Sequence, residues 1–181
     1  MVSYHKDERP FNIGFLLVEG FAMMSYAAAS EPFRAANVLA GKTLYNVSNI
    51  SLFGGQVSSS GAGVVKTKAQ IGEQIEFDLL LVLAGPEPTK FNDKRVFQWL
   101  RNLSRRGVKL GGVSGGPAIL VAAGLMNDYR MTIHWEHAPS LVEMSPNLKL
   151  EKSIFVIDRD RYTCAGGIAA LDMIHELIAS H

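Results

Sequence analysis

The chain has 181 residues, of which 48% are hydrophobic and 19% are charged, and its formal net charge is +1. This length suits one domain with a sizeable core, and the composition is that of an ordinary soluble globular protein. The near-neutral charge excludes a strongly basic nucleic-acid-binding surface, because phosphate contacts need clustered Lys and Arg side chains.

Residues 1–10 are polar, and we predict a mobile tail there. The run 13–29 is nearly all apolar and ends in three alanines, which mimics a signal peptide. Glu19 interrupts this run and helical patterning continues to Ala40, so we expect no cleaved leader. The Glu19–Gly20 pair also breaks any membrane-spanning helix.

Strands and helices alternate along the rest of the chain. In the first half we predict strands at 12–18, 45–53, 64–67 and 78–83, a turn at 54–63, and a helix at 23–40 that is bent or restarted at Pro32. In the second half we predict helices at 92–106, 118–123 and 134–143, a strand from Val108 to the glycine-rich turn, a hairpin of 155–157 with 162–164, and a final helix from Ile168. This alternation favours a doubly wound α/β sheet.

In such a sheet, ligands bind at the carboxyl ends of the strands, near the point where strand order reverses. Three loops should meet there: 19–25, 85–89 and the turn around Ser114. The single cysteine, Cys164, lies in a strand-like run. It excludes an internal disulfide, favours a reducing compartment such as the cytoplasm, and should be buried and unreactive.

The most informative motif is Gly-Val-Ser-Gly-Gly at 112–116, which we call the elbow. A sharp turn there projects Ser114 above the sheet and directs the backbone N–H groups of Gly115 and Gly116 at the same spot. The motif formally matches the serine-hydrolase elbow, with His134 as the plausible base. However, the one acidic residue between them is Asp128, in a turn-like segment, and an α/β-hydrolase needs a larger sheet.

Metal and cofactor motifs are weak. His134 and His137 have a spacing that suits a metal, but no further ligand is near. The glycines at 61–63 lack the third glycine of a dinucleotide fingerprint, and Gly41-Lys42-Thr43 lies at the wrong side of a turn for a phosphate loop. We expect no metal and no cofactor.

At the elbow and at Thr132-Ile133-His134-Trp135, the chain resembles the ThiJ/PfpI group of the class I glutamine amidotransferase-like superfamily. Members of this group carry a cysteine at the elbow, a later histidine, an acidic residue after the first strand, and a Gly-Gly pair after a central strand. The segments 31–37, 122–126 and 132–135 further resemble the sensor domain of AraC-family transcriptional regulators. The resemblance covers 11–181 and implies one flavodoxin-like ligand-sensing domain, a doubly wound parallel sheet with helices on both faces.

The departures from the family pattern bear on function. Ser114 replaces the cysteine, Ser25 stands at the acidic position, and Ala84 replaces the first glycine of the pair, although Gly85 remains. A serine without a coupled base is not nucleophilic. We therefore expect no enzyme activity, but retained anion-binding N–H groups at Gly85 and Gly115.

The resemblance implies a small-molecule-sensing, non-catalytic domain that controls the catabolism of an amino acid or a quaternary amine. The effector carboxylate would meet Gly85, Gly115 and the Ser114 hydroxyl, beside His134. Its cationic end would face Trp135 by cation–π attraction, with Glu136 as counter-charge; the competing interpretation makes Trp135 a core aromatic.

In that family, two-fold dimers bind DNA through a carboxyl-terminal helix-turn-helix domain, which this chain does not contain. We expect a homodimer that contacts no membrane. The alternatives are a serine hydrolase that uses Ser114 on the same fold and an oligomeric scaffold without a ligand.

Overall fold

A computed structural model describes residues 9–181. The predicted tail, 1–10, therefore lies outside the described residues except for Arg9 and Pro10. The Arg9 guanidinium donates to both carboxylate oxygens of Asp78, at 2.7 and 2.8 Å. This ion pair joins the start of the described chain to the residue just before the central strand.

A seven-stranded sheet forms the centre of the molecule, in the order β10-β11-β7-β6-β1-β2-β5. Neighbouring strands are parallel except for the edge pair β10–β11, which is antiparallel. The strands are β1 (Phe11–Leu17), β2 (Tyr45–Ser51), β5 (Ala69–Gln70), β6 (Leu79–Ala84), β7 (Lys109–Ser114), β10 (Phe155–Asp158) and β11 (Arg161–Cys164). The run β2-β1-β6-β7-β11 has the flavodoxin order, which confirms the predicted doubly wound sheet.

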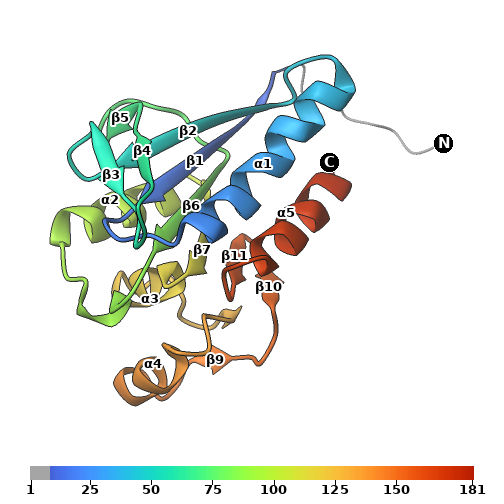
Figure 1. Ribbon diagram of the computed structural model, residues 1–181. Coiled ribbons are helices and arrows are strands. Elements are labelled where there is room, and N and C mark those ends of the chain that lie inside the picture. The colour runs from blue at the N-terminus through green and yellow to red at the C-terminus, as the bar shows by residue number, and fades with distance from the viewer. Residues whose placement is uncertain (1–8) are drawn as a thin grey trace.

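Helices cover both faces of the sheet (Figure 1). On one face, α1 (Met23–Ala40) and α5 (Ala169–Ala179) lie side by side over a core that includes Phe15 and Phe33. On the other face, α2 (Lys94–Arg105) and α3 (Gly116–Ala122) pack over a second core. β6 is buried along its whole length because it contributes to both cores, as expected of a strand in a parallel sheet.

Short elements complete the fold. They are a hairpin of β3 (Gln56–Ser58) and β4 (Val64–Lys66), the 3-10 helix η1 (Pro88–Lys90), a parallel pair of β8 (Arg130–Met131) and β9 (Lys149–Leu150), and α4 (Ala138–Met144). Among residues 9–181, no helix is both long enough and apolar enough to cross a membrane.

Four predicted elements need correction. The strand predicted at 45–53 ends at Ser51, and β3 begins inside the predicted turn 54–63. The helix at 23–40 is continuous through Pro32, so it is not restarted there. The helix predicted at 134–143 begins only at Ala138, because the preceding residues form a turn that brings the His134 N–H to within 3.3 Å of the Ser114 carbonyl.

Candidate functional site

The loops that follow β1, β6, β7 and β11 meet at the carboxyl edge of the sheet. The first two are in very close contact: a Cβ atom on Gly85 would lie 1.7 Å from the Gly20 carbonyl oxygen. The neighbour is backbone, so a side chain at this position would force one of the two loops to shift. Position 85 therefore requires glycine.

Ser114 ends β7 in a left-handed conformation, with φ of 60°, which is strained for a residue other than glycine. Its residue surface is 8% exposed. Within residues 9–181, its hydroxyl makes no hydrogen bond, and no histidine nitrogen lies within hydrogen-bonding distance of it. A serine so placed has the elbow backbone of a nucleophile but lacks the base that a nucleophile needs.

The backbone N–H groups at the elbow are not equally available. The N–H of Gly115 donates to the Ala84 carbonyl at 3.1 Å. By contrast, the N–H groups of Gly85 and Gly116 have no acceptor within the described part of the chain. A Cβ atom on Gly115 would lie 2.8 Å from both the Gly85 carbonyl oxygen and the Pro88 side chain. The elbow is therefore in contact with the loop after β6.

His134 is brought to the elbow, and the next two residues, Trp135 and Glu136, are exposed to solvent. The His134 side chain is 30% exposed, whereas that of Glu136 is 68% exposed and Trp135 is 77% exposed. The interpretation of Trp135 as a core aromatic is therefore wrong. The rings of Trp135 and His137 lie 5.6 and 5.5 Å from the His134 ring, centroid to centroid. Burial, and then the nearby His134, lower the pKa of His137.

The loop after β11 covers the elbow, and no local sequence pattern indicates this contact. A Cβ atom on Gly166 would lie 2.6 Å from the Ser114 Cβ, so position 166 has no room for a side chain. The next residue, Gly167, donates its N–H to the Ser25 hydroxyl at 2.7 Å. The serine at the family's acidic position thus holds the loop that packs on Ser114.

Cys164 lies on the strand next to the elbow, paired with Val113. Its side chain is buried, as predicted. Burial raises the pKa of its thiol to about 12, although the N–H groups of Gly166 and Ser114 oppose this shift. The thiol is therefore protonated near neutral pH and does not replace the missing elbow nucleophile.

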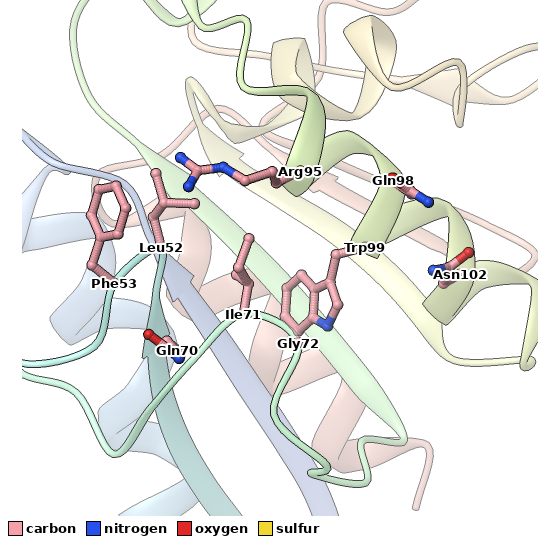
Figure 2. Close-up of a pocket in the computed structure, with 9 residues that line it drawn as sticks. All are labelled: Leu52, Phe53, Gln70, Ile71, Gly72, Arg95, Gln98, Trp99 and Asn102. Carbon is pink, nitrogen blue, oxygen red and sulfur yellow. The ribbon is translucent and has the colours of Figure 1, made fainter.

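Three cavities, of about 400, 570 and 480 Å³, lie away from the elbow residues. The first is an open cleft between α2 and the segment 70–72 (Figure 2). The second lies beside the first residues of β1 and β2, and the third beside their carboxyl ends. Over residues 9–181, no group of three or more His, Cys, Asp or Glu side chains is suited to hold a metal ion.

Comparisons with known proteins match this chain to one protein family and to transcriptional regulators. Residues 13–180 match the model of the DJ-1/PfpI family. The HTH-type transcriptional regulator GlxA of Rhizobium meliloti (strain 1021) is 47% identical over 168 residues, which are 92% of this chain and 52% of that protein. The HTH-type transcriptional regulator CdhR of Pseudomonas aeruginosa is 39% identical, over 91% of this chain and 49% of that protein.

Solved structures agree with this result. The crystal structure of an AraC family transcriptional regulator from Pseudomonas putida superposes with a TM-score of 0.85 at 29% identity, covering 94% of this chain and 92% of that one. A ThiJ/PfpI domain protein from Brachyspira murdochii shares the fold at 18% identity, with a TM-score of 0.81 over 94% of this chain and 96% of that one. This chain spans about half the length of the curated regulators that it matches.

Proposed function

The chain belongs to the DJ-1/PfpI family, and from this premise we propose that it is the small-molecule-sensing, non-catalytic domain of an AraC-type DNA-binding transcriptional regulator. Curated relatives with 47% and 39% identity are transcriptional regulators, which supports this assignment. DNA contact would come from a helix-turn-helix domain outside these residues, and the regulator would act in the cytoplasm. The genes that it controls would serve the catabolism of its effector.

One observation carries the non-catalytic part of the proposal: within the described residues, the Ser114 hydroxyl has no base. An acyl-transfer serine needs a histidine within hydrogen-bonding reach and a group that orients that histidine. The His134 Nδ1 atom instead accepts from the N–H of Glu136, at 3.4 Å.

A fluorophosphonate probe tests this point directly. We expect no stoichiometric labelling of the wild-type protein, and equal residual esterase and peptidase rates in wild type and Ser114→Ala. Turnover that disappears in Ser114→Ala would establish the serine-hydrolase alternative and contradict the proposal.

The effector, in this proposal, is a small carboxylate or zwitterion such as an amino acid or a betaine, bound at Gly85, Ser114, Gly115, His134, Trp135 and Glu136. The N–H of Gly85 and the hydroxyl of Ser114 are donors without an acceptor among the described residues, and both suit a carboxylate. The Gly115 N–H would contribute only after leaving the Ala84 carbonyl. The exposed Trp135 ring can hold an ammonium group, which is worth about 0.5–2 kcal/mol.

Calorimetry on the purified protein tests the effector class, after a thermal-shift screen of amino acids and quaternary amines has identified a ligand. A ligand at one hundred times its Kd adds about 2.7 kcal/mol to the free energy of unfolding, which such a screen detects. Trp135→Ala should weaken a quaternary amine more than a simple carboxylate. Equal losses for the two ligands, or tight binding of a purely apolar ligand, would contradict the proposed site.

We also propose a homodimer, because AraC-type regulators bind paired half-sites that suit a two-fold axis. Sedimentation equilibrium should detect a dimer at micromolar concentration. A monomer at concentrations well above micromolar would contradict this part of the proposal and leave the sensing function intact.

A further inference from the structure

The open cleft between α2 and the segment 70–72 combines aromatic side chains with one cation (Figure 2). Its volume of about 400 Å³ lies within the usual range for ligand pockets, about 300–1,000 Å³. We call it the α2 cleft, and the residues that line it are Leu52, Phe53, Gln70, Ile71, Gly72, Arg95, Gln98, Trp99 and Asn102. Four of these are large apolar or aromatic side chains, and the polar ones include three amides.

Arg95 is the one charged side chain among these lining residues. Its Nε and Nη2 atoms donate to the Asp93 carboxylate at 3.1 and 2.6 Å, which orients the guanidinium. Within residues 9–181, Nη1 has no acceptor. The guanidinium carbon lies 5.2 Å from the centroid of the Phe53 ring, so a cation lies beside an aromatic surface. Figure 2 shows this guanidinium extending from α2 toward Leu52 and Phe53.

Aromatic rings are available on two sides of the α2 cleft. Phe53 is 72% exposed, on a loop whose next two residues, Gly54 and Gly55, have φ of 73° and 76°. On the α2 side, Trp99 is half-buried, with its ring edge-to-face against Phe77 at 6.3 Å. The Phe53 ring is therefore largely open to solvent, whereas the Trp99 ring packs against the core.

We propose that the α2 cleft binds a small aromatic carboxylate, with its ring against Phe53 and Trp99 and its carboxylate on Arg95. A carboxylate matches the planar guanidinium donors, and the absence of an acidic side chain from the lining favours a monoanion. An aromatic body matches the ring surfaces, because offset or edge-to-face ring pairs add about 0.5–1.5 kcal/mol to simple burial. This site shares no residue with the effector site proposed at the elbow.

The two tryptophans of the chain allow the two sites to be tested separately. In Trp135→Phe the remaining indole is Trp99, so its fluorescence reports the α2 cleft. We expect a saturable change when this variant is titrated with benzoate, and a clearly weaker effect of the neutral isostere benzamide. In Trp99→Phe the remaining indole is Trp135, which reports the elbow, so any benzoate bound there is measured separately from the α2 cleft.

Three charge variants sharpen the test in the Trp135→Phe background. Arg95→Gln should weaken benzoate about tenfold or more, as expected for the loss of a charge-assisted hydrogen bond. The α2 helix keeps its cap in this variant, because it is the Arg95 backbone N–H that donates to Asp93, at 2.9 Å. Lys94→Gln is the matched control on the neighbouring residue, which does not line the α2 cleft, and it should leave the affinity unchanged.

Asp93→Asn should strengthen benzoate binding, because the guanidinium loses a competing carboxylate while asparagine still caps the helix. A purely structural role for the Asp93–Arg95 pair predicts no such gain. Equal affinity for benzoate and benzamide, equal affinity of wild type and Arg95→Gln, or no saturable change of Trp99 emission would each overturn the proposal. None of these outcomes decides the effector test, which compares by calorimetry how Trp135→Ala weakens a quaternary amine and a simple carboxylate.

Discussion

The elbow and the α2 cleft are two candidate ligand regions that are built in opposite ways. The elbow is formed by backbone, and Cβ atoms on Gly85, Gly115 and Gly166 would lie 1.7, 2.8 and 2.6 Å from their nearest neighbours. The α2 cleft is formed by side chains, and a Cβ atom on its glycine, Gly72, would have no neighbour within 4 Å. The elbow therefore owes its shape to missing side chains, whereas the cleft owes its shape to the side chains present.

The largest expected effect comes from a matched pair of glycines, Gly166 at the elbow and Gly72 in the α2 cleft, with φ of 85° and 88°. Alanine is strained at such angles, so Gly72→Ala should lower the free energy of unfolding by about 1–2 kcal/mol. Gly166→Ala should cost a further 1–3 kcal/mol, roughly, because its Cβ overlaps Ser114. Urea denaturation of both variants measures the difference.

A double variant identifies the cause of that difference. Replacing Ser114 by Gly in the Gly166→Ala protein removes the atom that the new Cβ meets first, and part of the stability should return. Equal losses in Gly166→Ala and Gly72→Ala would instead mean that the loop after β11 moves away freely, and the contrast between the two regions would fail.

The next effect concerns the two tryptophans. Trp99→Ala in the α2 cleft should lower the free energy of unfolding by about 2 kcal/mol, because the half-buried ring packs edge-to-face on Phe77. Trp135→Ala beside the elbow should change it by less than about 0.5 kcal/mol, because that ring is 77% exposed. Thermal unfolding of the two variants measures both. A larger loss for Trp135→Ala would mean that its ring packs against protein in solution.

A smaller effect is expected at Ser114. Ser114→Ala should change the free energy of unfolding by less than about 0.5 kcal/mol, because no hydrogen bond is lost. Ser114→Gly relieves the strain of the positive φ but makes the unfolded chain more flexible, so a net gain of up to about 1 kcal/mol is expected. Chemical denaturation ranks the variants, and a loss above about 1 kcal/mol in Ser114→Ala would reveal a hydroxyl partner.

The smallest expected effect is a difference between the two regions in how stability depends on pH. Burial and His134 lower the pKa of His137, so the folded state disfavours its protonation. His137 therefore contributes to the free energy of unfolding above its ordinary pKa of 6.5, and this contribution is lost as pH falls through the lower pKa of the folded state. At the α2 cleft, the hydrogen bond from Arg95 lowers the pKa of Asp93. The contribution of the Asp93 carboxylate to stability is therefore lost only below the ordinary carboxyl pKa of 3.8.

Urea midpoints between pH 7 and 5 measure this difference, roughly the range over which histidine titrates. His137→Gln should flatten the profile in this range, whereas Asp93→Asn should leave its slope unchanged. His181, whose pKa burial also lowers, contributes the remaining slope in both variants. The same slope in His137→Gln as in wild type would place the titrating group elsewhere.

The sheet could be predicted from the sequence because its signals are local. Continuous apolar runs such as 12–18 and 78–83 predict buried parallel strands, and the bounds of β1 and β6 each differ from these by one residue. The elbow could be predicted for the same reason, because a single glycine-rich segment forms the turn that ends β7. Family membership was likewise predicted from motifs whose residues are close in sequence.

The features that could not be predicted from the sequence depend on contacts between segments that are distant in the chain. Gly166 covers Ser114 from a loop far along the chain, and no local pattern indicates which glycine packs on which serine. The α2 cleft combines residues of the β2–β3 loop, the end of β5 with the two residues after it, and one face of α2. Trp135 is exposed because the turn at 134–137 replaces the first turn of the predicted helix, a choice fixed by the His134 contact with the Ser114 backbone.

The hydrogen bond from Gly167 to Ser25 joins residues 142 positions apart in the chain, at the place where α1 meets α5. During synthesis, α1 leaves the ribosome long before α5, so the apolar side chains that α5 later covers stay open to solvent until α5 emerges. Pairings of such wide sequence separation slow folding, because the chain must close a long loop before the contact is gained. This face of the sheet should therefore become ordered late, and the nascent chain is most exposed to aggregation just before α5 arrives.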